Sequence, residues 1–227
     1  MGRIIGITGI DTGIGKTYVT GLLARVLNNR GIRVITAKAV QTGSSTQIAE
    51  DILQHRRLMG IPLQKEDEAG LTCPYSYRLP ASPQLAAREE GETIDPSKIA
   101  SCLTTLAHAW DIVLVEGAGG LLVPLTDRYT FLSFFQEYRI PVCLVTSARL
   151  GSINHTWLTM EMLLQHDIEV LSIFYNLFPP AYPPITEDSY NLFSSLWPTI
   201  PIVRIPYGDD PRPIEETRFA PVLRAIT

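Results

Sequence analysis

Hydrophobic and polar positions along the chain follow two alternating patterns. Short apolar runs rich in β-branched residues are typical of strands that are buried on both faces of a sheet. Between them lie stretches whose apolar positions repeat every three to four residues, as on one face of a helix. The runs predict strands at 3–8, 34–40, 111–115, 141–146, 169–175 and 201–205. The periodic stretches predict helices at 18–29, 46–59, 83–90, 95–108, 153–165 and 191–196.

This alternation predicts the α/β fold class, with a single-domain, mostly parallel sheet and helices on both of its faces. The 227 residues suit one compact domain over 1–227, and no internal repeat divides them. Ser82 and Pro83 favour a helix start with Ser82 as its cap, and the proline-rich segment 179–184 favours a loop. In such folds ligands bind where the carboxyl ends of strands meet the amino ends of helices.

Composition narrows the class of protein. Hydrophobic residues make up 45% of the chain and charged residues 19%, which excludes a disordered protein. The net charge of −4 argues against a nucleic-acid-binding surface, and no apolar run approaches the roughly 20 residues of a membrane helix. The start of the chain lacks a signal-peptide pattern, and three widely spaced cysteines are typical of reduced thiols. We therefore expect a cytoplasmic protein without nucleic-acid or membrane partners.

A glycine-rich turn joins the first predicted strand to the first predicted helix. The segment 9–17 reads GIDTGIGKT and ends in Lys16 and Thr17. Glycines let backbone amides surround phosphate oxygens, the lysine neutralises the β- and γ-phosphates, and the threonine hydroxyl can bind Mg²⁺. Five residues separate Gly9 from Gly15, where the common motif has four. Because a strand precedes the turn and a helix follows it, the motif predicts nucleotide binding and a P-loop NTPase-like sheet.

Three further charged residues are candidates for the site, two at the ends of predicted strands and one in a predicted helix. Glu116 follows the strand 111–115 and precedes a glycine-rich turn, which makes it a candidate Mg²⁺ ligand. Lys38 lies near the end of the second strand, where a lysine either points into water or stabilises a transferring phosphoryl group. Asp51 lies in a polar helix, where an acid is usually just solvated, so the pattern alone does not favour a metal role. The four histidines form no recognisable ligand cluster.

Five segments together resemble the dethiobiotin synthases, the enzymes that close the ureido ring in biotin biosynthesis. They are 9–17 (GIDTGIGKT), 38–43 (KAVQTG), 74–83 (PYSYRLPASP), 116–125 (EGAGGLLVPL) and 150–155 (LGSINH). The sequence departs from the family pattern at Ala39, where proline is usual, at Gln84, where histidine is common, and at Gly13 and Glu50. These departures affect the details of substrate contacts more than the reaction.

The resemblance implies an ATP- and Mg²⁺-dependent reaction. A carbamate formed from 7,8-diaminononanoate and CO₂ attacks the γ-phosphoryl group of ATP, and the second amine then displaces phosphate and closes the urea ring. Lys16, Lys38 and Thr12 would be catalytic. Mg²⁺ would be the cofactor, held by Thr17, Asp51 and Glu116, so that the family match raises Asp51 above what the pattern alone supports.

The resemblance also implies which residues contact each substrate and that the protein is a homodimer. The substrate carboxylate would bind a motif of the neighbouring subunit at 150–154, although an ordinary helix start with Asn154 as its cap explains the same pattern. The implied ATP contacts are Asp11, Thr12, Gly13, Ile14, Gly15, Lys16, Thr17, Tyr18, Glu116, Asn176, Pro206 and Tyr207. The implied contacts with the other substrate are Thr12, Lys38, Thr42, Ser82, Gly119, Leu150, Gly151, Ser152, Ile153 and Asn154.

Other protein classes share parts of this pattern. The partitioning and septum-site ATPases have a second lysine early in the phosphate loop, and here Asp11 occupies that place. The cobyrinate-type amidating synthases need an additional glutamine-hydrolysing domain, for which 227 residues leave no space. A binding module derived from an enzyme is disfavoured because Lys16, Thr17, Lys38 and Glu116 are all present.

Overall fold

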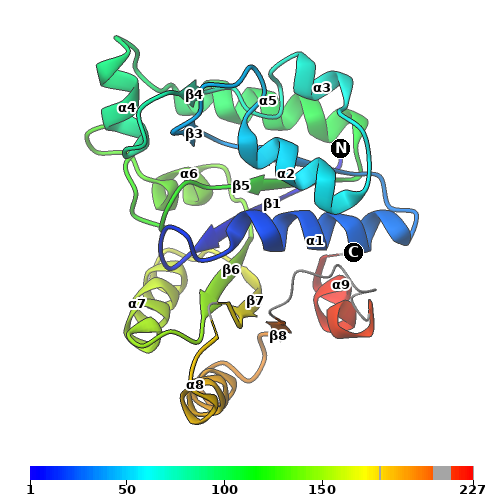
Figure 1. The fold of residues 1–227 in the computed structure, drawn as a ribbon, viewed down its shortest axis with the longest axis vertical. Coiled ribbons are helices and arrows are strands. Elements are labelled where there is room, and N and C mark those ends of the chain that lie inside the picture. Colours follow the sequence, from blue (N-terminus) through cyan, green and yellow to red (C-terminus); the bar gives the residue numbers. More distant parts are fainter. Residues whose placement is uncertain (179, 207–215, 227) are drawn as a thin grey trace.

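A parallel six-stranded sheet forms the centre of the molecule (Figure 1). The computed structural model describes residues 1–178, 180–206 and 216–226. The strand order is β2-β5-β1-β6-β7-β8, and every neighbouring pair is parallel. The strands are β1 (Arg3–Gly9), β2 (Val34–Lys38), β5 (Ile112–Glu116), β6 (Val142–Ser147), β7 (Val170–Asn176) and β8 (Ile202–Ile205). The predicted fold class is confirmed.

Helices cover both faces of the sheet, and the direction of each crossover determines the face. The chain moves across the sheet in one direction from β1 to β2 and in the opposite direction from β2 to β5 and from β6 to β7. Because such crossovers are right-handed, α1 lies on one face and α5 and α7 on the other. The helices are α1 (Lys16–Asn29), α2 (Glu50–Met59), α3 (Lys65–Glu68), α4 (Pro83–Glu89), α5 (Pro96–Ala109), α6 (Phe131–Glu137), α7 (Ser152–Gln165), α8 (Pro183–Leu196) and α9 (Ala220–Ile226), with a 3₁₀ turn η1 (Glu216–Phe219).

The core follows from the apolar runs of the sequence. Every residue of β2, β5 and β6 is buried, and Ile5 and Ile7 of the central strand β1 are completely inaccessible to solvent. Such strands have no polar face because helices pack on both sides of the sheet. The parallel register places all strand carboxyl ends at one edge, so that the residues following β1, β2, β5 and β7 are brought together.

Several predicted boundaries are wrong for identifiable reasons. The first helix begins at Lys16 rather than at 18, because Gly15 has a left-handed φ of 97° and forms the N-cap directly after the glycine turn. The strand predicted at 34–40 ends at Lys38, and the helix predicted at 46–59 begins at Glu50. The helix predicted at 191–196 begins at Pro183, inside the segment predicted as a loop, because proline suits the first turn of a helix. The Ser82 side chain makes no capping hydrogen bond.

Several short elements were not predicted from the sequence. A two-stranded sheet pairs β3 (Gln41–Thr42) with β4 (Ser76–Tyr77), and α3, α6, η1 and α9 were not predicted. In α6 four of the seven residues are apolar and buried, and the helix is too short for its sequence to show a helical period. Across the described ranges, no helix is both long enough and apolar enough to cross a membrane.

Candidate functional site

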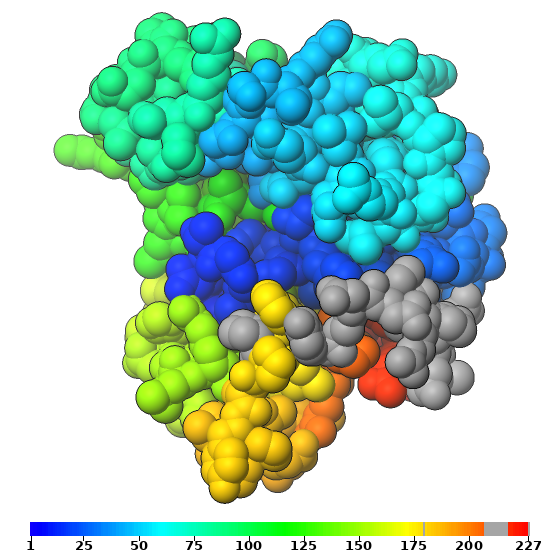
Figure 2. Space-filling view, in the orientation of Figure 1, coloured from blue at the N-terminus to red at the C-terminus, as the bar shows by residue number. Residues whose placement is uncertain are grey.

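A cavity of about 670 Å³ opens at the edge of the sheet where β1, β2, β5 and β7 end. Figure 2 shows the segments around it on one face, with the blue surface of the chain start between the cyan surface of α2 and the yellow surface that leads into α8. The residues that line the cavity are Thr12, Gly13, Gly15, Lys16, Thr17, Tyr18, Lys38, Val40, Gln41, Thr42, Glu50, Asp51, Gln54, Glu116, Ala118, Gly119, Asn176, Phe178 and Pro206.

The loop between β1 and α1 forms one wall of the cavity. Lys16 begins α1, is 6% exposed, and donates a hydrogen bond from Nζ to the Asp11 carbonyl oxygen at 2.8 Å. Burial, and then the positive charge of Lys38, lower the pKa of Lys16 to about 8. The loop thus presents a helix amino terminus and a lysine to one space, which is the arrangement that binds phosphate groups.

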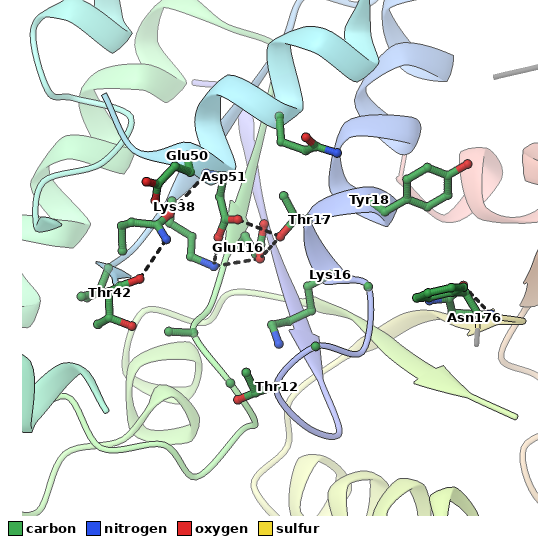
Figure 3. Close-up of a pocket in the computed structure, with 18 of the residues that line it drawn as sticks. Thr12, Lys16, Thr17, Tyr18, Lys38, Thr42, Glu50, Asp51, Glu116 and Asn176 are labelled. Carbon is green, nitrogen blue, oxygen red and sulfur yellow. Dashed lines mark hydrogen bonds and ion pairs between the residues drawn. The ribbon is translucent and has the colours of Figure 1, made fainter. Parts of the chain in front are cut away.

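Two carboxylates and a hydroxyl meet Lys38 at the centre of the cavity (Figure 3). Lys38 Nζ lies 2.6 Å from Asp51 Oδ2 and 2.8 Å from Glu116 Oε1. Thr17 Oγ1 lies 3.1 Å from Asp51 Oδ1 and 3.0 Å from Glu116 Oε1. The register explains the Lys38–Glu116 pair, because these two residues are direct partners across β2 and β5.

Opposite charges control the ionisation of this cluster. Burial on its own raises the pKa of Glu116, but Lys38 and the hydrogen bond from His55 outweigh it and lower the pKa to about 2. Burial likewise lowers the pKa of Lys38, but the negative charges of Glu116 and Asp51 outweigh it, so that the net pKa is raised. Lys38 and Glu116 therefore form a buried ion pair at neutral pH.

The three predicted metal ligands fit Mg²⁺ by their chemistry and position. Thr17, Asp51 and Glu116 supply hard oxygen ligands, and the Thr17 hydroxyl is within 3.1 Å of both carboxylates. Within the part of the chain that the structure describes, no group of three or more His, Cys, Asp or Glu residues could hold a metal by itself. The set suits an ion that takes its remaining ligands from phosphates and water, as Mg²⁺ usually does.

His55 joins the cluster, and sequence reasoning missed it. It lies one turn after Asp51 on α2, is completely buried, and places Nε2 at 2.9 Å from Glu116 Oε2. The spacing of four residues from Asp51 was the available signal, since residues i and i+4 share a helix face. A lone histidine in a periodic helix gives no sign of a partner that is sixty-one positions away.

Aromatic and amide groups form one end of the cavity, on the far side of Lys16 from Lys38 (Figure 3). Asn176 ends β7, donates from Nδ2 to the Ile14 carbonyl oxygen at 2.9 Å, and accepts from the Phe178 amide at 3.2 Å. A carboxamide has two donor hydrogens and two acceptor lone pairs, so one donor and one acceptor are left for a ligand. Tyr18 and Pro206 also line this end of the cavity.

Thr12, Gly119 and Thr42 line the remaining part of the cavity. Gly119 has a φ of 65°, and a Cβ at this position would lie 3.3 Å from Thr12 Oγ1 and 2.7 Å from a Val123 methyl group. The loop after β1 and the loop after β5 can therefore approach this closely only with glycine at position 119. Thr42 lies in β3, which the short parallel pairing with β4 holds beside the cavity.

Other predicted site residues do not line this cavity. Asp11 and Ile14 are linked to it through lining residues, because the Asp11 carbonyl accepts a hydrogen bond from Lys16 and the Ile14 carbonyl accepts one from Asn176. The Asp11 carboxylate forms an ion pair with Arg149. Ser82 is exposed at the start of α4. The segment 150–154 lies outside the cavity, and Gly151 rather than Asn154 caps α7. Tyr207 lies outside the described residues.

Solved structures resemble this chain in fold alone. The apo McdA of Cyanthece superimposes with a TM-score of 0.64 at 12% identity over all of both chains. The cell division ATPase MinD of Pyrococcus furiosus gives a TM-score of 0.57 at 20% identity and covers all of this chain and 98% of its own. At such identities the likeness shows the architecture and carries no argument about activity.

Sequence comparisons identify the family. A family model described as an AAA domain matches residues 3–223. The ATP-dependent dethiobiotin synthetase BioD 2 of Haemophilus ducreyi is 51% identical over 79% of this chain and 84% of its own length. The ATP-dependent dethiobiotin synthetase BioD of Chlorobaculum tepidum is 50% identical over 86% of this chain and 81% of its own. This chain belongs to the family of ATP-dependent dethiobiotin synthetases.

Proposed function

We propose that this protein closes the ureido ring of dethiobiotin from 7,8-diaminononanoate, CO₂ and ATP, and that the cavity described above is its active site. The proposal rests on one observation. A single cavity at the ends of three parallel strands is lined by Lys16, Lys38, Thr17, Asp51 and Glu116. Two cations and a hard-oxygen cluster at a phosphate-binding loop suit the transfer of a phosphoryl group to an anionic acceptor.

The first chemical step activates the carbamate. One carbamate oxygen forms a bond to the γ-phosphorus of ATP while the bond to the β-γ bridging oxygen breaks, which gives ADP and a carbamic-phosphoric anhydride. The carbamate and the γ-phosphate are both negatively charged, so negative charge is concentrated where they meet. Lys16, Lys38 and Thr12 line one cavity, where the two lysines would supply positive charge at that point and Thr12 a hydroxyl donor.

The second step closes the ring. The free amine forms a bond to the carbamoyl carbon, the bond from that carbon to the phosphoryl oxygen breaks, and phosphate leaves with its bonding electrons and takes up the proton that the amine loses. The protein contributes mainly by holding the amine against the carbon, a contribution that is worth several kcal/mol in well-oriented reactions. Thr42 and Gly119 lie beside Lys38 and Thr12 where the diamine would bind.

Thr17, Asp51 and Glu116 would hold Mg²⁺, which would neutralise charge on the β- and γ-phosphates when bound. Asn176 would read the adenine base with the donor and the acceptor that it keeps free, while Tyr18 and Pro206 would line the base site. The contact between Asn176 and the Ile14 carbonyl ties the base site to the phosphate loop, so that the two ends of the nucleotide are positioned by one connected unit.

We propose a homodimer in which the segment 150–154 of one subunit binds the substrate carboxylate at the cavity of the other. Large apolar side chains are exposed on and beside α7, with exposed fractions of 88% for Leu150, 41% for Trp157 and 59% for Leu158. Large apolar side chains exposed along one helix support a protein interface there. Leu158→Glu is expected to give a monomer by analytical ultracentrifugation, and Asn154→Ala to raise the KM for the diamine more than that for ATP.

The proposal takes residues 1–227 as one synthase domain that works in the cytoplasm. All three cysteines are free thiols, with Cys143 buried and Cys73 and Cys102 partly buried. Free thiols suit a reducing compartment.

The deciding experiment measures phosphate release from ATP and Mg²⁺ with bicarbonate and 7,8-diaminononanoate each added or withheld. We expect release only when both are present, with one dethiobiotin formed per phosphate. Lys16→Ala and Lys38→Ala should each cost at least about 2 kcal/mol of transition-state stabilisation. Hydrolysis that does not respond to the diamine would instead support a switch ATPase that acts on protein partners.

A further inference from the structure

The imidazole of His55 makes a buried hydrogen bond with Glu116 at the end of β5. The reaction described above does not use this hydrogen bond. His55 has no exposed surface, and its Nε2 lies 2.9 Å from Glu116 Oε2. The two oxygens of Glu116 have different partners, because Oε1 accepts from Lys38 and Thr17 on the cavity side. His55 therefore contacts the back of the carboxylate.

The direction of this hydrogen bond follows from the charge of Glu116. A carboxylate can only accept, and Glu116 forms an ion pair with Lys38, whose Nζ lies 2.8 Å from Oε1. The hydrogen must therefore be on His55 Nε2. A donor at this position fixes the rotation of the carboxylate group, so that Oε1 stays directed at Lys38 and Thr17.

The other ring nitrogen of His55 argues against a role in packing alone. Nδ1 is buried and has no hydrogen-bond partner among the described residues. A leucine or methionine would fill a similar volume next to α1 without burying an unpartnered polar atom, which costs stability. The benefit of the histidine therefore lies at Nε2, in its bond to Glu116.

We propose that His55 is a positioning residue that holds the Glu116 carboxylate with Oε1 directed at Lys38 and Thr17, the orientation in which Glu116 would bind Mg²⁺. This inference rests on the proposed function, because it takes Glu116 as a metal ligand. Groups behind a metal ligand typically change metal affinity by 10- to 100-fold when they are removed. His55 would change the metal affinity through its hydrogen bond to the carboxylate ligand Glu116.

The test compares four variants by their affinity for Mn²⁺, used as a spectroscopic probe of the Mg²⁺ site in the presence of ADP. Free Mn²⁺ is measured by electron paramagnetic resonance. His55→Leu removes the donor and keeps the volume, and we expect about tenfold weaker binding. His55→Gln places an amide Nε2 hydrogen near the original position and should stay within about threefold of the wild type. Ile52→Val, a purely apolar change at a fully buried position of the same helix, should keep the wild-type affinity.

Glu116→Gln separates failure of this inference from failure of the proposed function. If Glu116→Gln leaves Mn²⁺ affinity unchanged, Glu116 is not a ligand and the metal assignment fails. If Glu116→Gln weakens Mn²⁺ binding while His55→Leu does not, or if His55→Gln loses as much affinity as His55→Leu, the role of His55 is overturned.

A spectrum of the wild-type protein tests the same idea by locating the hydrogen on the His55 ring directly. With ¹⁵N-labelled histidine, the His55 signal should show a hydrogen on Nε2, and the signal is assigned by its loss in His55→Gln. An Nε2 that carries no hydrogen would contradict the proposed hydrogen bond to Glu116 and overturn the inference.

Discussion

Replacing Asp67 by Asn is expected to destabilise the protein severely, because it breaks a buried ion pair that joins α3 to α2. Asp67 follows α2 in the chain and lies in α3, and its side chain is completely buried. Its carboxylate accepts two bonds from Arg56 of α2, at 2.8 and 2.7 Å. It also accepts from the Gln64 amide and the Thr72 hydroxyl, both at 2.8 Å.

The magnitude follows from what the substitution leaves behind. Asparagine has nearly the same size, so no large cavity forms, but Arg56 keeps its buried charge without a counter-charge. One carboxamide group also cannot accept all four hydrogen bonds, since its nitrogen donates. Breaking a buried pair by removing one partner costs about 3–5 kcal/mol. For a protein of this size, that corresponds to a fall in Tm of roughly 6–20 °C.

The assay is thermal unfolding followed by circular dichroism, with Asp111→Asn as the matched control. Asp111 pairs with Arg33 through several hydrogen bonds as well, but the two side chains are 46% and 67% exposed. Water can replace the lost interactions there, so we expect a Tm close to that of the wild type. Equal falls in Tm for the two variants would refute the argument that burial makes the Arg56–Asp67 pair important.

Acid should reduce the difference between Asp67→Asn and the wild type. Burial on its own raises the pKa of Asp67, but the hydrogen bonds and charge of Arg56 outweigh it and hold the pKa below its usual value. The stability contributed by this carboxylate is therefore present above about pH 4 and is lost as the pH falls through the lowered pKa. A difference in Tm that stays constant from pH 7 to pH 2 would contradict this.

Three further predictions concern the nucleotide site. Because the pKa of Lys16 is lowered to about 8, ATP affinity measured by fluorescence titration should fall about tenfold between pH 7 and pH 9, and a constant affinity would contradict this. Gly15→Ala places a Cβ 2.3 Å from Asn176 Nδ2 and should abolish ATP binding, whereas Gly31→Ala, which has a similar left-handed φ and no near neighbour, should lose only stability, by about 1–3 kcal/mol. Lys38→Met leaves two carboxylates without their cation, so millimolar Mg²⁺ should raise its Tm more than that of the wild type, as measured by calorimetry.

The sheet could be predicted because buried parallel strands leave a direct mark on the sequence. A strand such as β5 is covered on both faces, so all five of its residues are buried and none needs to be polar until Glu116. The helices were less predictable at their ends, where single residues decide. Pro183 at the start of α8 is an example, since proline ends a helix in one context and begins one in another.

The candidate site could be predicted where its residues lie at strand ends. Lys38 and Glu116 end β2 and β5, and Lys16 follows β1, so the parallel topology alone brings these three together. The contacts of the segment 150–154 could not be tested in the same way, because one chain contains only half of the proposed interface. The ion pair of Asp11 with Arg149 was also not foreseen, since 138 positions separate the two residues.

His55 shows what a sequence cannot reveal about such a site. Its position on α2 follows from helical spacing, and Glu116 follows from a strand end, but their contact depends on how α2 packs over β2 and on the register that pairs Lys38 with Glu116. A shift of that register by one residue would turn the Glu116 side chain to the opposite face of the sheet, away from α2. The same register therefore determines both the ion pair of Lys38 and the hydrogen bond of His55, and substitutions that disturb the β2–β5 pairing should weaken the two interactions together.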